Sequence, residues 1–235
     1  MTIELDLNQI QTDFIRYAKI NTRSYPGRDT TPSTPGQTEL AKLLVTQLQE
    51  LGLQDVGLNP ENGFVTATLP ANTDKPVKSF GIIAHLDTAD YNAENVQPQV
   101  HPHYDGKPIN FANGLSLTVE QFPALKQYFG QTLITSDGTT LLGVDDKAGI
   151  AGAVATARYL LAHPEVKHGL IKFGFGPDEE IGVGPISLMR KALQPTLRIP
   201  WIMAIPGKLN TRPLTLLKPP SPLKGLRFIP ARPRD

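Results

Sequence analysis

Apolar residues recur at helical spacing in three parts of the chain. The pattern predicts helices over residues 8–20, 39–51 and 148–162. Gly52 directly follows the second segment, where a glycine favours the end of a helix. The third segment is apolar on nearly every side, which is typical of a helix buried in a core.

Between these helices, runs of apolar and β-branched residues predict strands. The runs cover residues 64–69, 79–84, 131–135, 140–142 and 170–175. Asp137-Gly138 lies between the third and fourth runs and favours a turn there. Strands that alternate with helices are typical of an α/β domain. We therefore expect a mainly parallel sheet with helices on both faces, over residues 1–184.

The first candidate site is His85-Leu86-Asp87, which directly follows the run at 79–84. Residues two apart on an extended chain point the same way, so His85 and Asp87 could face one metal ion. A histidine at a strand end beside a helix-capping aspartate gives the same pattern. The motif alone does not decide between these interpretations.

The second candidate site is Gly143-Val144-Asp145-Asp146-Lys147-Ala148-Gly149, a turn that leads into the apolar helix. Asp145 could bridge two cations, and the glycines would allow close approach of the backbone. Aspartate is also a favoured residue at a helix N-terminus, so an ordinary cap is the alternative.

The third candidate site is Asp178-Glu179-Glu180, which follows the strand predicted at 170–175. Three adjacent carboxylates repel one another unless cations neutralise them. One glutamate could bind metal while its neighbour takes a proton from bound water. The alternative is a solvated acidic loop.

Taken in order, the three motifs resemble the zinc aminopeptidase and aminoacylase clan. The segments TLPAN, AHLDT, GQTLITSDGTTLLGVDDKAGIA and PDEEIGVG are similar to the peptidase T family in particular. The resemblance covers almost everything up to Gly184. It implies a catalytic domain that releases the N-terminal residue from tripeptides by hydrolysis. Aminoacylase, carboxypeptidase or dipeptidase specificity is the alternative within the clan.

The resemblance also implies a role for each residue of the site. It makes His85, Asp145 and Glu180 zinc ligands, with Asp145 bridging two zinc ions. Glu179 would be the general base for the bridging water, and Asp87 would orient and polarise His85. The zinc pair would polarise the scissile carbonyl and acidify the attacking water. The other four histidines match no ligand position.

Residues 185–235 do not continue the resemblance. They hold ten Lys or Arg, ten Pro and one acidic residue. The family has two further ligands and an inserted lid domain, for which this stretch has no counterpart. Codons shifted by one base can encode family-like strings in family order, including one that begins at Gly225. We therefore expect an irregular, out-of-frame tail, which sequencing the gene across the codons for Gly184 and Pro185 tests.

Composition excludes several classes of protein. The chain has no cysteine, so it has neither disulfides nor thiolate metal sites. Its first residues include acids and form no signal peptide, and no apolar run approaches the ~18 residues needed to span a membrane. We expect a cytoplasmic protein with small peptide partners.

The basic tail raises the alternative of a non-catalytic nucleic-acid binder, which the codon pattern disfavours. With three of five family ligands, we expect an inactive fragment.

Overall fold

The computed structural model describes residues 4–182, 200–205 and 208–213. Its three long helices are α1 (Leu7–Ala18), α2 (Pro35–Glu50) and α3 (Val144–Ala162). The Asp6 side chain accepts a hydrogen bond from Gln9 N at 2.9 Å and so caps the start of α1. All three predicted helices are confirmed. α2 begins four residues earlier than predicted, whereas the regular part of α3 begins after Asp146, close to the predicted start at residue 148.

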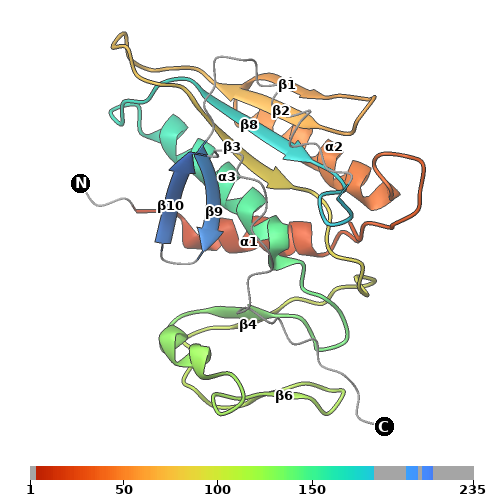
Figure 1. Ribbon diagram of the computed structural model, residues 1–235. Coiled ribbons are helices and arrows are strands. Elements are labelled where there is room, and N and C mark those ends of the chain that lie inside the picture. The colour runs from red at the N-terminus through yellow and green to blue at the C-terminus, as the bar shows by residue number, and fades with distance from the viewer. Residues whose placement is uncertain (1–3, 183–199, 206–207, 214–235) are drawn as a thin grey trace.

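One four-stranded sheet organises the fold, in the order β1-β2-β8-β3 (Figure 1). Its strands are β1 (Gln54–Leu58), β2 (Val65–Leu69), β3 (Phe80–His85) and β8 (Ile171–Gly176). The predicted α/β class is confirmed, but the sheet is mixed rather than mainly parallel. Only β3 and β8 run parallel, because α3 lies between them in the chain. β2 is antiparallel to both β1 and β8, and a short turn joins it to β1.

The core lies on one face of this sheet. Alternate residues of β2 and β8 belong to a single buried cluster with residues of all three helices: Val65, Ala67, Leu69, Ile171, Phe173 and Phe175. The residues between them, such as Thr66 and Lys172, point the other way. Within the described residues, the helices therefore cover one face of the sheet, whereas helices on both faces were predicted (Figure 1).

A long excursion separates β3 from α3. It contains β4 (Gln99–His101), β5 (Ile109–Asn110), β6 (Ser116–Leu117), the 3₁₀ helix η1 (Pro123–Tyr128) and β7 (Leu133–Thr135). β7 pairs with β4, whereas the strand predicted at 140–142 does not form. The turn at Gly138 is present, with φ of 88°.

The described part of residues 185–235 contains two further strands. They are β9 (Pro200–Ile205) and β10 (Lys208–Pro213), which pair antiparallel with each other. Irregular structure was predicted for this stretch, and most of that prediction lies outside the described residues. In the described part of the chain, no helix combines the length and apolar character needed to cross a membrane.

Candidate metal centre

The parallel pairing of β3 with β8 brings the first and third motifs together. His85, the last residue of β3, lies opposite Gly176, the last residue of β8. Leu86 N donates to Gly176 O at 2.7 Å and continues the pairing by one residue. The loop that carries Glu179 and Glu180 therefore begins beside His85, at the carboxyl edge of the sheet.

The second motif reaches the same edge from the start of α3. Gly143 adopts a left-handed conformation, with φ of 77°, and a Cβ there would lie 3.1 Å from Thr88 Cγ2. Asp145 and Asp146 have non-helical backbone angles, so the regular helix begins after them. This irregular start turns the Asp145 side chain toward His85, and Asp145 Oδ1 lies 3.0 Å from His85 Nε2.

Within the described residues, one group of side chains could share a metal ion. His85, Asp145 and Glu180 each offer a ligand atom, and these atoms lie within 4.8 Å of one another. His85 is half-buried, while both carboxylates are exposed. One imidazole nitrogen with carboxylate oxygens is a donor set that zinc accepts, so these residues fit the ion that the sequence implied.

Asp87 does not join this group, because its carboxylate already has other partners. Asp87 is fully buried. Its two oxygens accept hydrogen bonds from Glu179 N at 2.9 Å and Glu180 N at 3.0 Å. His85 Nδ1 lies 3.3 Å from Asp87 Oδ1 and 2.9 Å from the Asp87 carbonyl oxygen. Asp87 thus contacts His85, as predicted, and also binds the backbone of the third motif.

The charges of this cluster favour a cation. Burial alone would lower the pKa of His85, but hydrogen bonds to Asp145 and Asp87 outweigh it and raise the pKa to about 11. Burial and the negative charge of Asp145 raise the pKa of Glu180. Burial raises the pKa of Asp146 to about 6. The carboxylates around His85 thus favour a positive charge at this position.

The third motif divides into one buried and two exposed carboxylates. Glu179 and Glu180 are exposed, and Glu179 lies outside the group of candidate ligands. Asp178 is fully buried and accepts hydrogen bonds from Ser33 and Gln37. Sequence reasoning missed Ser33 and Gln37, because nothing local in the sequence connects them to a loop more than 140 residues away.

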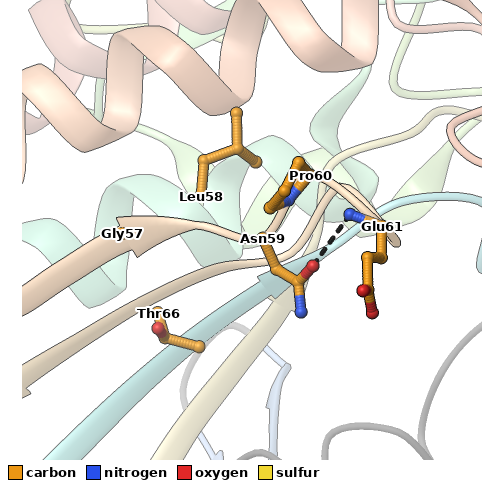
Figure 2. A pocket seen from close by; sticks show the side chains of 6 residues that line it. All are labelled: Gly57, Leu58, Asn59, Pro60, Glu61 and Thr66. Atoms are coloured by element: carbon orange, nitrogen blue, oxygen red, sulfur yellow. Dashed lines mark hydrogen bonds between the residues drawn. The ribbon is translucent and has the colours of Figure 1, made fainter.

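A separate cavity of about 460 Å³ lies at the turn between β1 and β2 (Figure 2). Its lining includes Asn59, Glu61 and Thr66, and Asn59 Oδ1 accepts a hydrogen bond from Glu61 N at 2.8 Å. None of its lining residues belongs to the candidate metal group. The cavity and the candidate metal group are therefore separate features of the described residues.

Comparison with solved structures identifies the fold. Aminopeptidase PepT from Bacillus cereus ATCC 10987 matches with a TM-score of 0.58 at 22% identity, over 83% of this chain and 42% of that one. The mixed sheet and its helical layer are thus the α/β fold of an aminopeptidase. A scan against protein-family models finds no match.

Comparison with curated sequences finds relatives that are named Peptidase T. The chain is 55% identical over 174 residues to Peptidase T of Limosilactobacillus fermentum. It is 56% identical over 173 residues to Peptidase T of Fusobacterium nucleatum subsp. nucleatum. Over the aligned residues, this chain is a homologue of Peptidase T. Each alignment covers 73% of this chain and 42% of the relative, so the chain spans less than half the length of these relatives.

Proposed function

We propose that this domain is the part of a zinc-dependent tripeptide aminopeptidase that supplies its first three metal ligands. The convergence of His85, Asp145 and Glu180 within 4.8 Å carries the proposal. These residues come from three motifs that are far apart in the chain. His85 ends β3, Asp145 lies at the start of α3, and Glu180 follows β8. Sequence identity of about 55% to Peptidase T supports the substrate class.

Each residue of the cluster has a proposed task. His85 Nε2 and the carboxylates of Asp145 and Glu180 would hold zinc, with Asp145 shared between two ions. Bound zinc polarises a peptide carbonyl and lowers the pKa of water at the site. Glu179, exposed beside the cluster, would accept the proton from that water and pass it to the leaving amine. Asp87 would keep the His85 ring turned toward the metal.

We further propose that this 235-residue chain binds metal weakly and does not turn over peptide. Exposed carboxylates hold metal less firmly than a closed cage of four ligands. The two other ligands that the family resemblance implies, a carboxylate and a histidine, have no counterpart in the sequence. No histidine follows His168.

A hydrolysis assay tests both parts of this proposal. The purified chain is incubated with a simple tripeptide, with and without zinc, beside a Glu179→Gln variant. We expect no zinc-dependent release of the N-terminal residue, while zinc binds to both proteins in calorimetry. Release that depends on zinc and disappears in Glu179→Gln would support Glu179 as base but contradict the proposed inactivity. Absence of zinc binding would contradict the metal site itself.

A further inference from the structure

Asp178 is a buried carboxylate that the proposed chemistry does not use. It adjoins Glu179 and Glu180, yet its exposed fraction is 0%. Ser33 N donates to its Oδ2 at 2.8 Å and Ser33 Oγ donates to its Oδ1 at 2.5 Å. With its oxygens already bonded inside the protein, Asp178 is not placed to bind metal.

Gln37 contacts Asp178 through both ends of its amide. Gln37 Nε2 donates to Asp178 Oδ1 at 2.7 Å, and Gln37 Oε1 accepts from Asp178 N at 3.1 Å. Gln37 is itself fully buried in the first turn of α2. One side chain therefore binds both the backbone and the carboxylate of Asp178, which fixes the orientation of that residue and not only its position.

The backbone at Asp178 is in a conformation that needs such support. Its φ is 60°, in the left-handed region that few residues other than glycine adopt. The turn between β1 and β2 packs closely against this loop. A Cβ at Gly63 would lie 2.6 Å from Pro32 Cγ and 3.2 Å from Pro177 Cγ. Three loops meet here: the one before α2, the turn between β1 and β2, and the third motif.

Residues 178–180 are therefore held from two sides. On one side Ser33 and Gln37 bind Asp178. On the other, the Asp87 carboxylate accepts the N–H groups of Glu179 and Glu180. The backbone of the loop is fixed while the side chains of both glutamates are exposed. Such an arrangement determines where the Glu180 carboxylate can reach.

We infer that Asp178, held by Ser33 and Gln37, is a positioning residue that aims Glu180 at the metal site and so sets its affinity for metal. This inference rests on the proposed metal site at His85, Asp145 and Glu180. Mutation of a residue that orients a metal ligand commonly lowers metal affinity by about 10- to 100-fold. Because Asp178 is separated from Glu180 by Glu179 and acts on it only through the backbone, we expect the lower end of that range.

The test is a cobalt titration of the full chain, read by visible absorption of the bound ion. It compares Asp178→Asn with Asp13→Asn at a temperature where circular dichroism shows both folded. Asp13 is a matched control, because it too is buried and accepts hydrogen bonds from Gln47 and Arg158. We expect both variants to melt earlier, but only Asp178→Asn to raise the cobalt Kd, by about tenfold.

A milder variant covers the case in which Asp178→Asn does not fold. Ser33→Ala removes one donor and keeps the Ser33 N–H, so we expect a smaller rise in Kd, again without counterpart in Asp13→Asn. Equal cobalt Kd values for wild type and the folded position-178 or position-33 variant would overturn the positioning role alone. Wild-type protein that binds no cobalt would overturn the metal site, and the positioning role with it.

Discussion

In the described part of the chain, buried polar groups form one network inside the helical layer and another at the strand ends. In the helical layer, Asp13 of α1 accepts hydrogen bonds from Gln47 of α2 and Arg158 of α3. Tyr17 donates to the same Gln47 at 2.7 Å. Each partner in this network is a side chain on a helix, so its hydrogen bonds join the three helices to one another.

At the strand ends, the partners are different. Asp87 accepts hydrogen bonds from the backbone N–H groups of Glu179 and Glu180, whose own carboxylates remain exposed. The first network thus holds elements together, whereas the second holds a loop so that its side chains face outward. The comparison teaches that equally buried carboxylates can join helices in one place and fix the backbone of a loop in another, where we propose that the loop places a metal ligand.

The largest expected effect on zinc affinity comes from His85→Asn, at the strand ends. This change removes the imidazole ligand, so we expect zinc affinity to fall by more than about 100-fold, since outer partners alone are worth about 10- to 100-fold. Calorimetric titration measures it, with His163→Asn as a control. His163 is half-buried and contacts Glu165. Equal zinc affinity in wild type and His85→Asn would contradict the site.

Asp87→Asn should have the next largest effect. It removes the charge that accepts two backbone N–H groups, so we expect zinc affinity to fall by about 10- to 100-fold. We also expect a loss of roughly 1–3 kcal/mol in the free energy of unfolding. Asp74→Asn makes the same charge change at an exposed position and should alter neither quantity. Wild-type zinc affinity in folded Asp87→Asn would contradict the assignment of the second network to ligand placement.

The third effect should be a dependence of metal affinity on pH. Hydrogen bonds to carboxylates raise the pKa of His85 to about 11, against the effect of burial, so the metal-free site holds a proton that metal must displace. Cobalt affinity should therefore increase with pH, by about tenfold per unit between pH 6.5 and 8. Absorption titrations at several pH values measure the slope. A flat profile would show that His85 does not lose a proton on binding.

The smallest effect should come from Tyr17→Phe in the helical layer. The change leaves Gln47 Oε1 without its 2.7 Å donor, so we expect a loss of about 1–2 kcal/mol in the free energy of unfolding. Because this network has no contact with the metal group, the zinc Kd should stay within about twofold. Urea denaturation and calorimetry measure the two quantities. A large change in zinc Kd would mean that the two networks are coupled.

Local patterns in the sequence predicted much of this structure. The helical periodicities found α1, α2 and α3, and the apolar runs found β2, β3, β7 and β8. The first and third motifs were expected directly after strands and the second at the start of a helix, and His85, Asp145 and Glu180 do lie close together. The roles assigned to these residues and to Glu179 stay predictions, as does the out-of-frame origin of residues 185–235.

What the sequence did not predict depends on contacts between distant residues. The strand β1 (Gln54–Leu58) has little apolar periodicity, and its short connection to β2 makes the sheet mixed. The acidic triplet gave no sign that Asp178 is buried while its neighbours are exposed. That difference comes from Ser33 and Gln37, which lie 145 and 141 residues away from Asp178.

The most direct test of the metal site follows the histidine rings themselves. The protein has five histidines, and ¹H–¹⁵N spectra of their side chains can be recorded at pH 7.5 with and without zinc. We predict that His85 starts with both ring nitrogens protonated, because the carboxylates hold its pKa at about 11. Zinc should remove the proton from Nε2, the nitrogen that faces Asp145, and leave the other four rings unchanged. A His85 signal that zinc does not alter, or a response at another histidine instead, would contradict the metal centre proposed here.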